Sequence, residues 1–150
     1  MNGSRLCVPL RAAVLGALLA CASDAFAAGH LVVEHAWIRT APPGAMMLAG
    51  YAVLRNDGDA PLTISGADSA TFGSVSLHQT VSEDGVERMR PLGEFVIAPG
   101  TGVAFEPGAK HFMLMRPQHE LAAGDRVDIH VATTIGDGAS ATFVVGDVAP

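Results

Sequence analysis

The segment VSLHQTVSEDGVERMR, residues 75–90, decides the fold class of this 150-residue chain. It consists of two short runs of strand-forming residues with the turn residues Ser-Glu-Asp-Gly between them. The Asp-Gly pair at positions 84 and 85 is a strong signal for a two-residue type I′ turn, whose twist matches that of paired strands. The segment therefore predicts an antiparallel β-hairpin.

The same pattern of short strands and turn signals continues in both directions along the chain. Clusters of Gly, Pro, Asn and Asp separate the runs, for example at residues 41–44, 56–59 and 136–138. Many short strands at this spacing, without an internal repeat or a linker, predict a single all-β domain built as a β-sandwich. The expected strands cover residues 31–38, 48–54, 62–65, 75–81, 86–90, 95–98, 103–105, 112–116, 127–133 and 139–145.

The first 27 residues have the features of a secretory signal peptide. A positive flank with two arginines precedes an apolar run over residues 12–20, and residues 25–27 form an A-x-A cleavage site. The apolar run is too short to be a transmembrane helix. We therefore expect cleavage after Ala27, export to the periplasm, and one folded domain over residues 28–150.

A lipoprotein interpretation of the same region stays open. The sequence Leu-Leu-Ala-Cys at residues 18–21 loosely resembles a lipoprotein box. Cleavage before Cys21 would leave a lipid-modified cysteine and a membrane-anchored protein. The leucine before the small residue is a weaker match, and the A-x-A site follows closely, so the soluble form is favoured.

Composition excludes several classes of function. Both cysteines, Cys7 and Cys21, lie in the targeting segment, so the exported domain has no disulfide, no thiolate nucleophile and no cysteine for a blue-copper centre. The formal net charge is −6, and no basic patch indicates nucleic-acid binding. No Ser-His-Asp arrangement, paired acid/base carboxylates or phosphate-binding loop is evident. We therefore do not expect an enzyme.

Two histidines and two methionines occur at the spacing H-x10-M-x21-H-x-M, as His78, Met89, His111 and Met113. In the predicted hairpin, Met89 lies opposite Thr80 and therefore diagonal to His78 on the same face, within reach of long side chains. His111 and Met113 are two residues apart in a strand, so their side chains also project to one face. The turn residues before His111 place it at the start of a strand, near the surface.

These four residues have the ligand chemistry of a soft metal site. A lone histidine in a strand is usually a surface or core residue, and a lone methionine usually fills the core. Together, however, two imidazoles and two thioethers are the ligands that Cu(I) prefers, whereas hard cations prefer oxygen. The ordered spacing of all four therefore predicts one Cu(I) ion in a roughly tetrahedral site.

The other methionines and histidines are interpreted as structural. Met115 has the parity of the two ligands in its strand and could supply a fifth sulfur, but a core position is favoured. Met46 and Met47 could form a methionine patch near the site, but ordinary loop and strand-start positions are favoured. Three further histidines have no partner at ligand spacing and are expected to be structural or solvent-exposed: His35, His119 and His130.

The cleavage prediction leads to a second metal hypothesis. Cleavage after Ala27 would leave a chain that begins Ala28-Gly29-His30. Its free amine, two amide nitrogens and the third-residue imidazole can form a square-planar site, the geometry that Cu(II) and Ni(II) prefer. A lipid-modified Cys21 would abolish this second Cu(II) site.

The four-residue spacing resembles the signature of the PCuAC family of periplasmic copper chaperones. The resemblance covers nearly all of residues 28–150 and includes the segments 36–44, 77–80 and 107–115. It implies a cupredoxin-like or Ig-like Greek-key β-sandwich that binds one Cu(I) near the surface through the four residues of the motif. Some members add a His- and Met-rich tail, which residues 144–150 do not resemble.

The resemblance also implies a role in copper transport. Family members deliver copper towards the assembly of cytochrome c oxidase, with a Sco-type protein or an oxidase subunit as the acceptor. We accordingly expect a monomeric Cu(I) metallochaperone. Two alternatives stay open, a copper redox protein and a metal-free extracytoplasmic β-sandwich that acts as an interaction module.

Overall fold

The computed structural model describes residues 29–136 and 138–148. The expected signal peptide, its cleavage after Ala27, the alternative lipidation of Cys21 and the position of Ala28 all lie outside these residues. The described part of the chain contains no helix that is long and apolar enough to cross a membrane.

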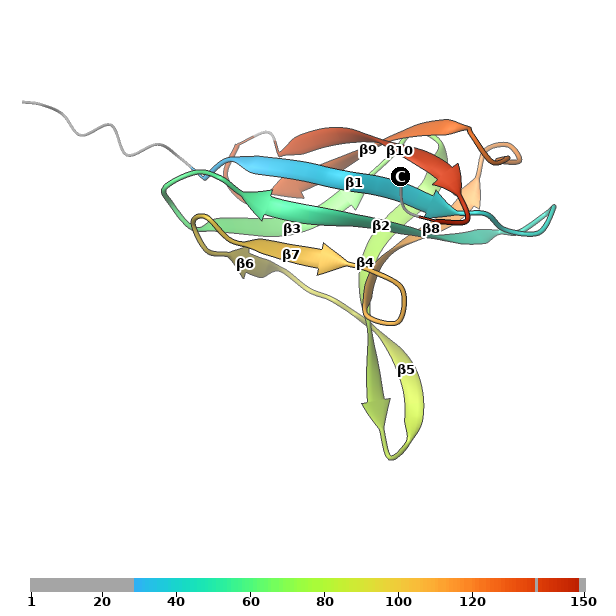
Figure 1. The fold of residues 1–150 in the computed structure, drawn as a ribbon, viewed down its shortest axis with the longest axis horizontal. Coiled ribbons are helices and arrows are strands. Elements are labelled where there is room, and N and C mark those ends of the chain that lie inside the picture. Colours follow the sequence, from blue (N-terminus) through green and yellow to red (C-terminus); the bar gives the residue numbers. More distant parts are fainter. Residues whose placement is uncertain (1–28, 137, 149–150) are drawn as a thin grey trace, which may run out of the picture.

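The described residues form ten strands, each at a position where the sequence predicts one (Figure 1). Most extend one to three residues beyond the predicted ends. The strands are β1 (Leu31–Arg39), β2 (Met47–Asn56), β3 (Leu62–Asp68), β4 (Phe72–Glu83), β5 (Val86–Pro91), β6 (Phe95–Ile97), β7 (Gly102–Phe105), β8 (Lys110–Pro117), β9 (Arg126–Thr133) and β10 (Ala139–Gly146).

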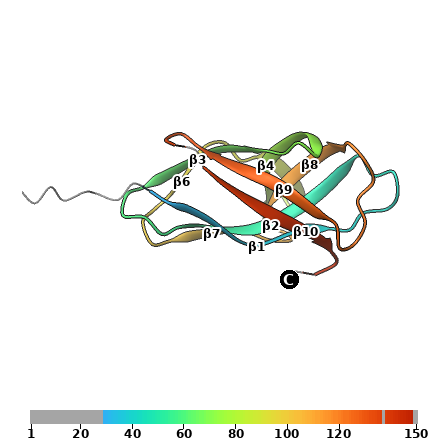
Figure 2. The same cartoon turned by 90° about the horizontal axis from the view of Figure 1, so that it is seen from above.

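The strands are hydrogen-bonded into one continuous sheet that folds over to make a sandwich. Its order is β5-β4-β8-β2-β1-β10-β9-β3-β6, and β7 pairs with β2 outside this path. The first strand is parallel to the last, and the other pairings are antiparallel. Figure 2 shows β1, β2 and β7 along one side of the sandwich and β3 and β4 along the other. The all-β sandwich that the sequence predicts is confirmed.

Aliphatic and aromatic side chains fill the space between the two sides. Phe112 lies at the centre, with ring centroids 4.9 Å from Phe105 and 5.3 Å from Phe143, the second pair in an edge-to-face arrangement that aromatic rings favour. Phe112 and Phe143 are completely buried. None of the buried hydrophobic residues in the described part of the chain is a methionine.

One buried polar residue, Asn56, connects the segment before β1, the β2–β3 loop and the end of β6. Asn56 is completely buried, and its side-chain amide donates to the carbonyl oxygens of Ala60 (2.8 Å) and Ile97 (3.0 Å). Its side-chain oxygen accepts from the backbone N–H groups of His30 and Gly58, both at 3.1 Å. All of its hydrogen-bonding capacity is therefore used within the protein.

The hairpin of β4 and β5 extends beyond the body of the sandwich (Figure 1). Thr80 pairs with Met89, and Glu83 with Val86, which leaves a two-residue turn at positions 84 and 85. Asp84 and Gly85 have φ values of 53° and 77°, as a type I′ turn requires. The predicted turn and register are thus confirmed, and every residue of β5 is exposed.

Candidate metal centre

Three adjacent strands bring the four residues of the motif onto one face. In the order β5-β4-β8, His78 pairs directly with His111, Met89 lies opposite Thr80, and Met113 lies opposite Ser76. Directly opposed residues of antiparallel strands project to the same side, as do residues two apart in one strand. The four side chains therefore share a face, as the hairpin parity predicts.

The two imidazoles lie close together at the centre of this group. Their ring centroids are 5.9 Å apart, and the ring planes are tilted by 34°. His111 is near the start of β8 and lines an open hollow, which agrees with the predicted position near the surface, although only 7% of its own surface is exposed. The reason is that β8 lies between β4 and β2, which flank it on both sides.

Each histidine has a ring nitrogen that lacks a hydrogen-bond partner. His78 Nδ1 and His111 Nε2 are buried, and no protein group within the described residues bonds to either atom. A buried polar group without a partner costs about 1–3 kcal/mol. Because a metal ion bound to both nitrogens would remove this cost, the orphaned atoms fit a metal site.

The environment of His111 also favours the form that binds metals. Burial lowers the pKa of His111, a backbone hydrogen bond with Ala109 acts in the opposite direction, and the nearby His78 lowers it further. Metal ligation requires a neutral imidazole. His111 is therefore kept in its metal-binding form at neutral pH.

The four side chains differ in their exposure. Met89 is 60% exposed on the projecting hairpin, and Met113 is half-buried on β8. An open hollow on this face is lined by Met89, His111 and Met113, together with Met47 and Tyr51 from β2. His78 is outside this lining and reaches the group through its pairing with His111. His111 is thus the buried member of the group, Met89 is the solvent-facing one, and His78 and Met113 are half-buried.

The kinds of donor that are present restrict the metal. Within residues 29–136 and 138–148, no group of three or more His, Cys, Asp or Glu side chains is placed to hold a metal ion. A metal bound by the four-residue group would therefore have two nitrogen and two thioether ligands, a set that favours Cu(I).

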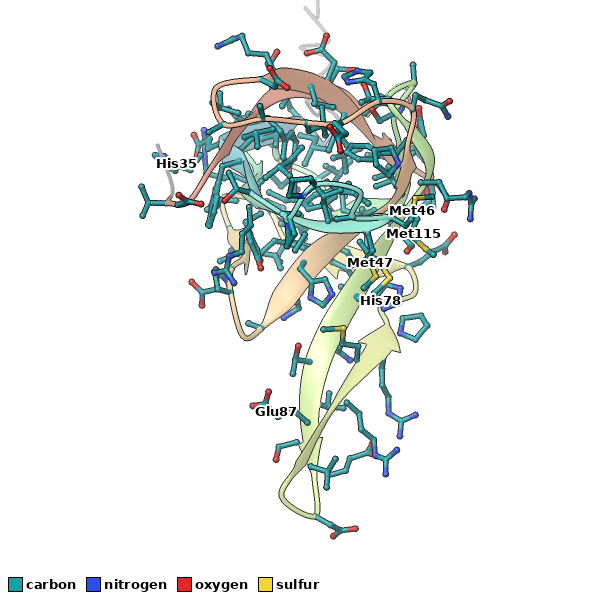
Figure 3. All side chains as sticks on the ribbon, turned by 90° about the vertical axis from the view of Figure 1, so that its right-hand side faces the viewer. His35, Met46, Met47, His78, Glu87 and Met115 are labelled. Carbon is teal, nitrogen blue, oxygen red and sulfur yellow. The ribbon has the colours of Figure 1, made fainter. Side chains whose placement is uncertain are left out.

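Met115 and Met47 lie closer to this group than expected. The prediction that Met115 is a core residue is wrong, because alternation along β8 directs Phe112 and Leu114 into the core and Met115 to the opposite face. Met47 is the first residue of β2, as predicted, and it pairs with Met115 and lines the hollow. Figure 3 shows Met46, Met47, Met115 and His78 gathered at this end of the molecule, with His35 away from them.

The remaining histidines have structural positions, as predicted. His35 is exposed at a bulge in β1, with φ of 52°. His119 Nδ1 lies 2.9 Å from the carbonyl oxygen of Glu120, and His130 Nδ1 lies 3.0 Å from Asp68 Oδ2.

The second metal hypothesis meets competing contacts at His30. The His30 backbone N–H donates to Asn56 Oδ1 at 3.1 Å, and His30 Nδ1 lies 2.5 Å from Asp57 Oδ1. A square-planar site would need this amide nitrogen, deprotonated, and the imidazole. Both contacts of His30 would therefore compete with the ion, and the site at Ala28-Gly29-His30 stays a hypothesis.

Comparison with known sequences identifies relatives over most of the domain. A family model described as "Putative lipoprotein LpqE-like" matches residues 31–145. A Leifsonia xyli protein with the same kind of lipoprotein description is 32% identical over 114 residues, which are 75% of this chain and 66% of that protein. The uncharacterised protein RP573 of Rickettsia prowazekii is 33% identical over 82 residues, 54% of this chain and 45% of that protein. The chain thus spans just under two thirds of the first relative and less than half of the second.

Comparison with solved structures identifies one fold. The apo PCuAC domain from PmoF1 superposes with a TM-score of 0.62 at 20% identity, over 81% of this chain and 100% of that domain. The Cu(I) form of DR1885 from Deinococcus radiodurans superposes with a TM-score of 0.60 at 27% identity, over 83% of each chain. These likenesses confirm the cupredoxin-like sandwich that the sequence predicts.

Proposed function

This chain belongs to the LpqE-like family, and we propose that it is an extracytoplasmic chaperone that binds one Cu(I) ion. We assign His78, Met89, His111 and Met113 as the ligands. The observation that carries the proposal is the meeting of two buried, unpartnered imidazole nitrogens with two thioethers on a single face. Two of the structures with this fold, the PCuAC domain from PmoF2 and DR1885, are described as copper-bound and Cu(I)-bound, which supports the choice of ion.

The ligand set suits a carrier that must release its ion. Imidazole and thioether are neutral ligands, so they hold Cu(I) less strongly than thiolates would. Thioethers also cannot form disulfides in an oxidising compartment, where cysteine pairs do. A thiolate-rich acceptor can therefore withdraw the ion by ligand exchange.

The exposure of the ligands indicates the route of transfer. Met89 is the most exposed of the four, and it lies on the edge strand of the projecting hairpin (Figure 1). An incoming acceptor can replace the Met89 sulfur first, while His111 still holds the ion from the buried side. We propose that copper leaves through Met89, and that the acceptor is a Sco-type protein or an oxidase subunit in the assembly of cytochrome c oxidase.

We propose that the chain is exported to the periplasm and that it acts there as a monomer. The lipoprotein description of the family and of the Leifsonia protein supports an exported or membrane-anchored protein. Intact mass of the exported protein tests the N-terminus directly. A chain that begins at Ala28 supports the soluble form, and a lipidated Cys21 replaces it with the anchored form.

A Cu(I) titration against a chromophoric competing chelator, without oxygen, tests the binding function. The parent protein is expected to bind one equivalent tightly, and Met89→Ala and His111→Ala to bind it much more weakly. Val86→Ala is a matched control on the other face of β5, and His119→Ala is a matched control for an exposed histidine. Equal, weak binding by the parent and all four variants would contradict copper carriage and favour the metal-free interaction module.

A further inference from the structure

All methionines of the described chain lie at one end of the molecule. Met89 and Met113 belong to the proposed Cu(I) site. Three others lie beside it: Met46 in the segment before β2, Met47 on β2 and Met115 on β8. The buried core contains none of them, so packing does not account for this concentration of sulfur.

Met47 and Met115 form a pair across two neighbouring strands. They are directly opposed in the antiparallel register of β2 and β8. Directly opposed residues have Cβ atoms about 4.5–5.5 Å apart, a separation at which two long thioether side chains can reach one ion. The next pair along the same face is Ala49 with Met113, so the two sulfurs lie one step from the proposed Cu(I) site.

Neither methionine of this pair is buried. Met47 is 52% exposed, and Met115 is half-buried without belonging to the hydrophobic core cluster. Met47 also lines the same hollow as Met89, His111 and Met113. Both thioethers are therefore accessible to an ion that approaches from solvent, and Met47 shares an opening with the first site.

We propose that Met47 and Met115 form a second, weaker site for a soft monovalent ion such as Cu(I). Thioether donors select soft ions and reject Mg²⁺ and Ca²⁺, which require oxygen ligands. An ion held by this pair is one ligand exchange from Met113. The second site uses none of the four ligands assigned above, so it stands or falls independently of them.

Methyl NMR with Ag(I), a redox-stable soft monovalent ion, tests the second site. The purified protein is labelled with ¹³C at the methionine methyl groups, and single Met→Leu variants assign each signal. The first equivalent of Ag(I) is expected to shift the methyls of Met89 and Met113, and the second those of Met47 and Met115. If the Met47 and Met115 signals stay in place through several equivalents, or shift fully with the first one together with those of Met89 and Met113, the second site does not exist.

Variants of matched chemistry locate the second ion. Met47→Leu and Met115→Leu are each expected to reduce the Ag(I) stoichiometry from two to one. Met46→Leu is the control, because Met46 is an exposed neighbour of Met47 that lines a different hollow. Retention of the second ion in Met47→Leu, or its loss in Met46→Leu, would overturn the assignment. Shifts at Met47 and Met115 without any at Met89 and Met113 would instead contradict the proposed function alone.

Discussion

The core of the sandwich and the face that carries His78 and His111 are built from different residues. The core is aliphatic and aromatic, fully buried, and contains no methionine among the described residues. The β5-β4-β8 face, with the first residue of β2, places thioethers and imidazoles beside solvent and leaves two ring nitrogens without partners. The difference indicates that stability and the proposed metal chemistry are separated in this protein. Each can therefore be changed while the other is left intact.

The largest expected effect on stability comes from the core. Phe143→Ala removes a completely buried ring that packs edge-to-face on Phe112. We expect the free energy of unfolding to fall by about 3–5 kcal/mol, since truncation leaves a cavity that the surrounding residues cannot fill. Denaturant unfolding measures this loss. A fall of less than about 1 kcal/mol would show that the core is less tightly packed than the structure indicates.

Asn56→Ala is expected to have the next largest effect. It removes the four hydrogen bonds that this completely buried side chain makes with two carbonyl oxygens and two backbone N–H groups. A loss of roughly 1–3 kcal/mol follows from the cost of burying unsatisfied groups. Cu(I) affinity should not change while the protein is folded, because Asn56 is on β2 beyond the stretch that pairs with β8. A matching loss of affinity would break the separation of core and face.

The hairpin turn offers a change that affects the face without the core. Gly85 has φ of 77°, and an added Cβ would meet no atom within 4 Å, so Gly85→Ala introduces backbone strain alone. That strain costs about 1–2 kcal/mol and should loosen the hairpin that carries Met89. We expect Cu(I) affinity to fall by up to about tenfold, and backbone amides of residues 82–87 to exchange faster with solvent.

Gly66→Ala on β3 is the matched control for the turn. Gly66 also has open space around its Cβ position, but its φ is not positive. Both Cu(I) affinity and hydrogen exchange in the hairpin should therefore equal those of the parent. If Gly85→Ala behaves like Gly66→Ala, the turn does not control the position of Met89.

The smallest expected effect concerns the acid side of the stability curve. A hydrogen bond with His30 lowers the pKa of Asp57 below its ordinary value of 3.8, and Arg55 also contributes to the lowering. A carboxyl whose pKa is lower in the folded state stabilises the protein above its unfolded pKa, and this contribution is lost as the pH falls through the folded pKa. Asp57→Asn should therefore make the loss of stability below about pH 4 slightly shallower. An unchanged acid slope in pH-dependent unfolding would contradict this.

The sequence predicted what depends on local spacing and missed what depends on distant pairing. The Asp84-Gly85 turn and the shared face of His78 and Met89 follow from parity within one hairpin, and both are confirmed. The burial of His111 depends on β4 and β2 flanking β8, which no spacing within the chain reveals.

Met115 shows the same limit. Its parity with Met113 was visible in the sequence, but parity alone does not say which face of β8 is the core. The pairing of Met115 with Met47 joins residues 68 positions apart, and only the structure shows it. The bulky Phe112 and Leu114, which alternate with Met113 and Met115, are the one local signal that the even-numbered face is the buried one.

X-ray absorption at the copper edge tests the central claim most directly. The protein is loaded with one equivalent of Cu(I) without oxygen, and the scattering from its nearest neighbours is measured. The proposed four-ligand site predicts a shell of two nitrogen and two sulfur atoms, with one sulfur lost in Met89→Leu and one nitrogen lost in His111→Ala. A shell of nitrogen and oxygen atoms without sulfur would contradict it.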